Sequence, residues 1–314
     1  MRPIRVPVLL WIAAPLLVFA CSSASGDGSS FPGQGGNGTG GTAGTIGLGG
    51  TGGGLDIDGA AGGGPPPCPQ ETQYVYVVTG DNVFYKFDPP TLMFNEIGKL
   101  SCPNTGGNTP FSMSVDRKGV AWVVFNGGKI YWVDVKTAKC TATSYVASQS
   151  GFTTFGMGFS SDSAGSIEET LYVSQSDVTA SIKGLAKINT TTLKLEPIHD
   201  YDLIKGKRAE MTGTGDGKLF GAFEGKPYIV AEIDKTNANI LSQAPQDAIQ
   251  YEPNSSNFAF AAWGGDFWLF VGPGTSTDVF QYKPADSTTD KVKSVDFEIV
   301  GAGVSTCAPV KPPA

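Results

Sequence analysis

The chain has 314 residues, of which 40% are hydrophobic and 16% are charged, and it carries a formal net charge of −7 at pH 7. This length allows one large β domain or two smaller domains once segments that cannot fold are set aside. The acidic balance, without a basic stripe, argues against nucleic acid as a partner.

Residues 1–20 have the features of a secretory signal peptide. Arg2 and Arg5 supply a positive n-region, and an apolar run of 14 residues follows before Ala20. A run of this length is too short to span a membrane comfortably. The sequence therefore predicts export of the chain.

Cys21 follows the apolar run in the sequence LVFAC, residues 17–21. This pentapeptide resembles the lipobox of bacterial lipoproteins, in which a small residue precedes a cysteine that is diacylated and becomes the new N-terminus. Phe19 is bulkier than the residue usual at its position, and the alternative is an ordinary signal peptide followed by a chance cysteine. Acyl chains on Cys21 would anchor the protein stably in the lipid bilayer. The resemblance implies an exported lipoprotein of the outer membrane, on its periplasmic side or at the cell surface.

Residues 21–67 combine the lipidated cysteine with a Gly-rich segment. Residues 22–67 contain 19 Gly in 46 positions and no Lys or Arg. Such a composition cannot bury enough apolar surface to offset its chain entropy. We expect a disordered tether with a reach of about 40 Å.

Residues 68–314 contain a unit that repeats five times. Aromatic strands start at residues 74, 121, 171, 219 and 267, and each is followed by a second apolar strand and a third, more polar strand. Segments of alternating small residues precede the aromatic strand in repeats two to five, and narrow side chains suit strands that converge on one axis. The repeats predict an all-β fold, a β-propeller of five four-stranded antiparallel blades. The alternative is six blades, with one hidden in the longer third repeat.

The second strand of most repeats ends in an Asx-x-x-Thr turn. Asp88, Asp134 and Asn189 each have a Thr three residues later, whereas Thr236 follows Asp234 after two residues. An Asp or Asn side chain at this position can accept hydrogen bonds from the following backbone. The fifth repeat has lost this pattern.

The first repeat has no inner strand in front of it. The sequence GAGVSTC, residues 301–307, has the same alternation of small residues as the other inner strands. We therefore expect the C-terminal strand to close the ring in blade one, where two sheet edges would otherwise stay unpaired. The turn that this arrangement cuts is flanked by Cys68 and Cys307, so a disulfide between them would replace it.

Cys102 and Cys140 are paired by elimination. The predicted strand order contradicts this pairing, because it places Cys102 after one outer strand and Cys140 near the start of the next, on opposite faces. Either the strand boundaries are off by a few residues or one thiol stays free.

As architecture, residues 68–314 resemble the YVTN, NHL and gluconolactonase-type propellers of bacteria. The sequence YVYVVTGDNVFYKFDPPTL, residues 74–92, is the stretch closest to their aromatic and Asp-ended strands. In gluconolactonase-type relatives, acidic and Asn residues of the channel ligate a divalent metal, and Glu210 and Asn257 are the comparable positions in this chain. Two oxygen donors are too few for a metal site, so Glu210 is a weak metal candidate and no cofactor is expected.

Propellers commonly bind ligands at the channel mouth where outer strands lead into the inner strands of the next blade. Six residues reach this mouth as candidates for ligand binding: Phe111, Phe155, Arg208, Glu210, Asn257 and Phe258. The alternatives are that the aromatic rings cap the core and that Arg208 and Glu210 form a surface ion pair of little consequence.

No catalytic residues are predicted. The sequence has one histidine, His199, in a region expected at the periphery, and it has no GxSxG, P-loop or CxxC motif. These features favour a non-catalytic binding or scaffold propeller whose partners are the bilayer and either a small polar ligand or an envelope protein. The alternatives are a metal-dependent lactonase or other hydrolase with its site at the channel mouth, and a structural subunit of an envelope assembly.

Overall fold

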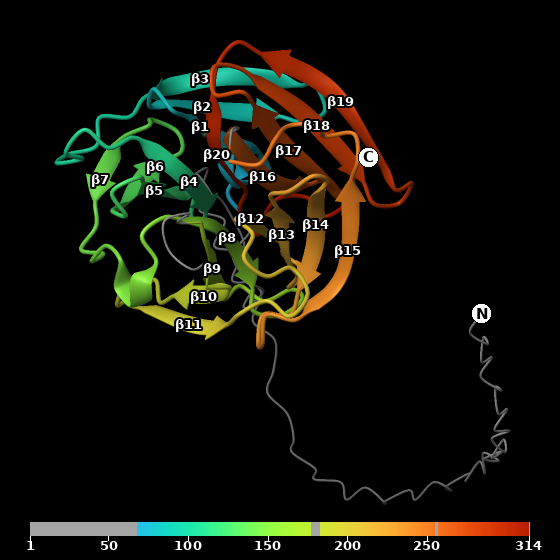
Figure 1. Ribbon diagram of the computed structural model, residues 1–314. Coiled ribbons are helices and arrows are strands. Elements are labelled where there is room, and N and C mark those ends of the chain that lie inside the picture. Colours follow the sequence, from blue (N-terminus) through green and yellow to red (C-terminus); the bar gives the residue numbers. More distant parts are fainter. Residues whose placement is uncertain (1–67, 177–182, 255–256, 314) are drawn as a thin grey trace, which may run out of the picture. The chain divides into compact units, whose positions relative to one another are not determined.

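The structure is a computed structural model that describes residues 68–176, 183–254 and 257–313. The predicted signal peptide, Cys21 and the tether lie outside these residues. Figure 1 shows five sheets arranged around a central axis, with β4, β8, β12, β16 and β20 nearest to that axis. No helix within the described ranges is long and apolar enough to cross a membrane.

Each blade is a four-stranded antiparallel sheet, whose strands are named in order from the inner to the outer edge. Blade one consists of β20 (Ile299–Gly303), β1 (Val75–Thr79), β2 (Val83–Asp88) and β3 (Met93–Lys99). Blade two consists of β4 (Pro110–Val115), β5 (Val120–Phe125), β6 (Ile130–Asp134) and β7 (Cys140–Ala142). Blade three consists of β8 (Phe155–Ser161), β9 (Glu169–Gln175), β10 (Leu185–Ile188) and β11 (Leu195–His199). Blade four consists of β12 (Ala209–Gly213), β13 (Leu219–Phe223), β14 (Tyr228–Ile233) and β15 (Ile240–Gln246). Blade five consists of β16 (Asn257–Trp263), β17 (Asp266–Gly272), β18 (Thr277–Lys283) and β19 (Thr288–Val295). Short 3-10 helices cover Gln70–Gln73 (η1) and Gln149–Gly151 (η2).

The predicted five-bladed propeller is confirmed, and the six-bladed alternative is wrong. The described residues of the two connections beside β9, namely 162–168, 176, 183 and 184, form no further strand.

The C-terminal strand closes the ring in blade one, as predicted. β20 pairs with β1, with Val77 opposite Ala302 and Tyr76 opposite Gly303. The strand comprises Ile299–Gly303 and not residues 301–307, because the segment from Val304 onward leaves the sheet. The inner edge of β1 is thus paired, which removes an exposed sheet edge at the join.

The inner strands pack closely against one another around the axis. A Cβ atom on Gly158 would lie 2.8 Å from the backbone N of Thr212, so only a residue without a side chain fits there. Small polar side chains bridge neighbouring inner strands: Ser114 Oγ accepts from the Phe159 N–H at 2.9 Å, and Thr212 Oγ1 accepts from the Ala262 N–H at 3.0 Å. The alternation of small residues is therefore a consequence of this close approach.

The hydrophobic core forms five clusters, and each of them lies between two neighbouring blades. Between blades five and one, the ring of Phe87 meets the rings of Trp268 and Phe270 at 5.4 and 5.6 Å. Because every blade buries both of its faces in this way, each blade needs both neighbours to keep its apolar side chains out of water.

The turn between the third and the outer strand has the same backbone geometry in all five blades. In each blade, the residue four positions after the Asx residue, or after Lys283 in blade five, has a positive φ between 53° and 64° although it is not glycine. These residues are Leu92, Ala138, Leu193, Ala238 and Ser287. In blade two, Asp134 Oδ1 accepts from the N–H of Lys136 and of Thr137, as the Asx pattern predicts. Blade five keeps this geometry although its sequence has lost the Asx motif.

Both predicted disulfides are present. Cys68 and Cys307 join with a Cα–Cα distance of 5.8 Å, and Cys102 and Cys140 join at 4.9 Å. The prediction that the second pair lies on opposite faces is wrong. Blade twist turns the end of each outer strand toward the start of the next one.

The same contact between outer strands recurs around the ring. Gln149, after blade two, accepts from the Leu195 N–H of blade three at 3.0 Å. Asp202, after blade three, accepts from the Ile240 N–H of blade four at 2.9 Å, and Gln246 of blade four accepts from Thr289 of blade five at 2.6 Å. The Cys102–Cys140 disulfide occupies this position between blades one and two.

We expect the ring-closing disulfide to contribute more stability than the second one. Its half-cystines are 239 residues apart, against 38 for Cys102 and Cys140, and a longer closed loop restricts the unfolded chain more. On the chain-entropy model, a Cys68→Ser/Cys307→Ser variant should lose about 5 kcal/mol of unfolding free energy, and a Cys102→Ser/Cys140→Ser variant should lose about 1.5 kcal/mol less than that. Urea unfolding followed by tryptophan fluorescence measures both, and a larger loss in the second variant would contradict the expectation.

Candidate functional site

The central channel opens at two mouths that differ in their lining. The upper mouth lies where the outer strand of each blade leads into the inner strand of the next. A cavity of about 390 Å³ occupies it. The described residues that line this cavity come from blades one, two, four and five: Gly80, Thr109, Pro110, Phe111, Asn126, Arg208, Glu210, Asn254, Asn257, Phe258, Gly274, Glu298 and Val300.

Glu210 lies on β12 at the base of the upper mouth. Its residue exposure is 2%, and its Oε2 accepts a hydrogen bond from Ser112 Oγ of blade two at 2.6 Å. Burial raises the pKa of Glu210 to about 8, and the Ser112 hydrogen bond and the charge of Arg208 oppose this shift. The carboxyl group is therefore largely protonated at neutral pH and can donate as well as accept a hydrogen bond.

Arg208 pairs with Glu224 and not with Glu210. Its Nε lies 3.3 Å from Oε2 of Glu224, and its guanidinium lies 5.3 Å from the centre of the Phe258 ring. Glu224 is buried, and its Oε1 accepts from the Asn254 N–H at 2.8 Å. The alternative of a surface Arg208–Glu210 ion pair is wrong, because the partly buried Arg208 pairs with Glu224, a buried carboxylate that follows β13.

The other predicted residues divide between mouth and core. Phe111 and Phe258 line the cavity, whereas Phe155 is fully buried beside Tyr145, with ring centres 6.3 Å apart. Phe155 thus caps the core, which was the alternative to ligand binding for the three aromatic rings.

Asn257 lines the cavity with an amide that is already engaged. Its Nδ2 donates to the Ile299 carbonyl at 2.7 Å, and its Oδ1 accepts from the Gly274 N–H at 2.9 Å. This side chain fixes the join between blade five and β20.

Two carboxylates of the mouth were not predicted from the sequence. Glu224 follows β13, and Glu298 precedes β20 with a pKa raised by burial and by the nearby charge of Asp81. The predicted mouth residues all came from the loops that lead into the inner strands. The turns after the aromatic strands open on the same face, so a lone Glu at the end of the apolar strand LFGAF was the available signal.

Within the described ranges, no group of three or more His, Cys, Asp or Glu side chains could hold a metal ion. His199 is exposed at the end of β11, and its Nδ1 lies 3.1 Å from the Asp200 carbonyl. Among the described residues, neither Glu210, the weak metal candidate, nor His199 belongs to such a group.

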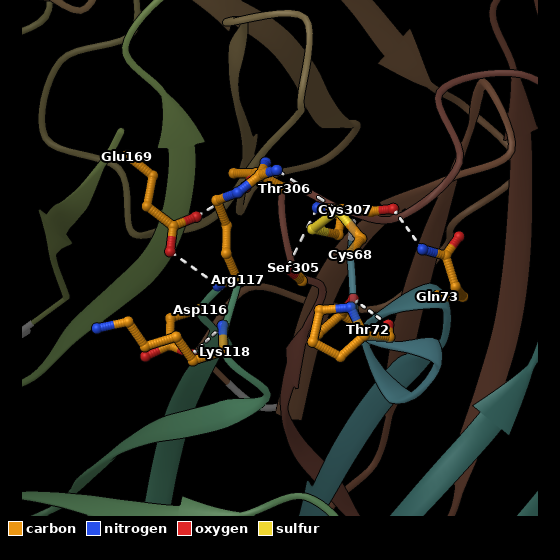
Figure 2. The surroundings of a disulfide bond; sticks show 11 residues. Cys68, Thr72, Gln73, Asp116, Arg117, Lys118, Glu169, Ser305, Thr306 and Cys307 are labelled. Atoms are coloured by element: carbon orange, nitrogen blue, oxygen red, sulfur yellow. Dashed lines mark hydrogen bonds between the residues drawn. A yellow bond between two sulfur atoms is a disulfide. The ribbon is translucent and has the colours of Figure 1, made fainter. Parts of the chain in front are cut away.

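The lower mouth is crossed by the segment that follows β20. Figure 2 shows Thr306 between Arg117 of blade two and Glu169 of blade three. Thr306 Oγ1 donates to Glu169 Oε2 at 2.7 Å and accepts from Arg117 Nη1 at 3.1 Å. The Cys307 carbonyl accepts from Gln73 Nε2 at 3.0 Å, next to the disulfide with Cys68.

This segment also reaches blades four and five. A Cβ atom on Gly215 of blade four would lie 2.3 Å from the Thr306 carbonyl oxygen, and the Gly264 N–H of blade five donates to the Pro309 carbonyl at 2.7 Å. Since Val304, Ser305 and Thr306 are buried, the C-terminal segment contacts all five blades at the lower mouth.

Comparisons with known proteins find likeness in fold only. No family model and no curated protein matches the chain. Among solved structures, the extracellular domain of a protein described as a one component system from B. thetaiotaomicron is 17% identical with a TM-score of 0.37, over 73% of this chain and 28% of that one. The Dos1 propeller is 13% identical with a TM-score of 0.39, over 71% of this chain and 56% of that one.

A third structure, of YCF48 bound to D1 peptide, is 14% identical with a TM-score of 0.35, over 69% of this chain and 62% of that one. This chain spans less than a third of the B. thetaiotaomicron protein's length and less than two thirds of the other two. The radial array of five four-stranded sheets makes the protein a β-propeller. The C-terminal segment crosses one mouth of its channel, and the other mouth is open. Its two disulfides indicate a protein that folds outside the cytoplasm, in an oxidising compartment.

Burial of Glu210 predicts a pH-dependent stability. The folded-state pKa of about 8 exceeds the ordinary value of 4.5, so the proton bound by Glu210 stabilises the folded state fully below about pH 4.5, and this stabilisation is lost as the pH rises through about 8. The unfolding free energy of the wild type should therefore fall by about 3 to 5 kcal/mol between these pH values, and Glu210→Gln should not show this part of the decline.

Urea unfolding at pH 5, 7 and 9 measures this effect, with Glu96→Gln on the exposed strand β3 as the matched control. A smaller decline of the same sign should remain in Glu210→Gln, because burial also raises the pKa of Glu169 to about 7. An equal decline in the wild type and in Glu210→Gln would contradict the expectation.

Proposed function

We propose that this protein is a non-catalytic binding propeller of the cell envelope, and that its upper mouth holds a small polar ligand with an amino group. The observation that carries the proposal is the cavity of about 390 Å³ with the buried Glu210 at its base. The volume of this cavity lies within the range of sites that bind small molecules.

The charges around the cavity favour an amino ligand. Arg208 and Glu224 neutralise each other at 3.3 Å, which leaves Glu210 and Glu298 as the unpaired carboxyl groups of the described lining. An ammonium group would donate to both of them and would favour ionisation of Glu210 on binding. The half-buried ring of Phe111 supplies apolar contact beside this polar base.

The ligand class can be tested with small compounds that differ only in charge. We expect putrescine and other small amines to stabilise the full-length protein against thermal unfolding, and matched diols and dicarboxylates to leave it unchanged. Glu210→Gln and Glu298→Gln should each weaken amine binding about tenfold or more in titration calorimetry, because a charge-assisted hydrogen bond is lost.

Glu96→Gln is the matched control and should bind like the wild type. Equal binding of amines by all four proteins would refute a site at the upper mouth. Turnover of a bound amide or lactone that disappears in Glu210→Gln would refute the non-catalytic assignment and favour the hydrolase alternative.

We further propose that acyl chains on Cys21 hold the protein at the outer membrane. The sequence LVFAC supports this, as does a disulfide-bonded domain that folds in an oxidising compartment. Cys21→Ser should move the protein from the membrane fraction to the soluble fraction of lysed cells, while the control change Ala14→Gly within the apolar run leaves it in membranes. Unchanged membrane association of Cys21→Ser would contradict acylation.

A further inference from the structure

A groove runs between blades two and three on the lower face, away from the upper mouth. Its volume is about 590 Å³. The floor consists of Trp122 and Phe159, the wall is formed by Trp132, and the rim carries lysine, glutamate and threonine side chains. None of these residues lines the cavity of the upper mouth.

Trp132 forms a rigid aromatic wall of this groove. It lies half-buried on β6, and its ring packs edge-on against Trp122 with centres 5.5 Å apart. Trp122 is itself fixed, since its Nε1 donates to Asp116 Oδ2 at 3.3 Å and its ring contacts Phe159 at 5.9 Å. A half-exposed indole held in this way presents a flat apolar surface at little entropic cost.

The polar groups on the rim include both donors and acceptors. Lys118 and Lys139 are exposed ammonium groups, and Glu168 is an exposed carboxylate. Within the described part of the chain, the side chains of these three residues have no ion pair or hydrogen bond. Asp116 and Asp134 add negative charge and Arg117 adds positive charge, so the lining has no strong net sign.

The groove continues along the edge of blade three. A smaller cavity of about 190 Å³ shares Glu169, Thr190 and Thr191 with it and extends to Lys187 and Glu196. The combined surface suits an elongated ligand that contacts hydroxyl, carboxylate and ammonium groups in succession.

We propose that this groove binds a neutral oligosaccharide, with one pyranose ring stacked on Trp132. A pyranose has an apolar face of C–H groups and an edge of hydroxyls that both donate and accept, which matches an aromatic wall beside a rim of mixed charge. A charged ligand would face a balanced rim that repels as much as it attracts. The proposal does not depend on the ligand of the upper mouth, because the two sites share no residue.

The test uses the purified full-length protein and an array of neutral and acidic glycans, followed by calorimetry with cellotetraose, chitotetraose and maltotetraose. We expect at least one neutral tetrasaccharide to bind and to shift the tryptophan emission. Trp132→Ala should weaken that binding about tenfold or more. Tyr85→Ala, which removes a half-buried ring from β2 in blade one, is the matched control and should bind normally.

Lys139→Ala and Glu168→Gln keep the test valid if Trp132→Ala does not fold, because both side chains are exposed and unpaired in the described structure. Each should weaken binding a few-fold without a change in melting temperature. Binding of acidic glycans alone, no glycan binding at all, or unchanged affinity in all three groove variants would overturn the proposal. Glu210→Gln should leave glycan binding intact, which separates this site from the upper mouth.

Discussion

The ring depends on how the two ends of the domain are joined. β20 pairs with β1, and the segment that follows it contacts every blade at the lower mouth and is then bonded through Cys307 to Cys68. In a ring of blades whose apolar clusters all lie between neighbours, an open join would expose one whole cluster and one sheet edge. Closure therefore gives every blade two neighbours, and all other contacts rely on it.

Closure also makes the two mouths chemically different. At the lower mouth, Thr306 donates a hydrogen bond to Glu169 and accepts one from Arg117, so the polar groups of these three side chains have partners within the protein. At the upper mouth, Glu210 has a hydrogen bond from Ser112 on one oxygen and faces a cavity. A buried carboxyl group that is only partly satisfied costs free energy, and the shift of its pKa toward the neutral form reduces that cost.

The two candidate binding surfaces are formed by different parts of the propeller. The upper mouth is made by loops that converge on the axis, so its residues come from four blades and are far apart in sequence. The groove beside Trp132 is made where two twisted sheets diverge, so its aromatic floor is an extension of the apolar cluster between blades two and three. A small enclosed ligand suits the first geometry, and an extended ligand suits the second.

The sequence by itself determined the propeller architecture, the four strands of each blade and the segment that closes the ring, while the structure decided for five blades over six. These follow from local patterns: aromatic strands recur at regular intervals, and inner strands need narrow side chains because they approach within contact distance of one another. The Cys68–Cys307 bond followed as well, since it replaces one missing turn.

Only the tertiary structure decided how blades meet. Blade twist brings Cys102 next to Cys140, although strand order alone places them on opposite faces. The partner of Arg208 is Glu224, which directly follows the neighbouring strand of the same blade, because the turn after β13 and the start of β12 lie side by side at the mouth. Phe155 turns into the core while Phe111 and Phe258 line the cavity, since packing between blades, and not strand position, sets which ring is buried.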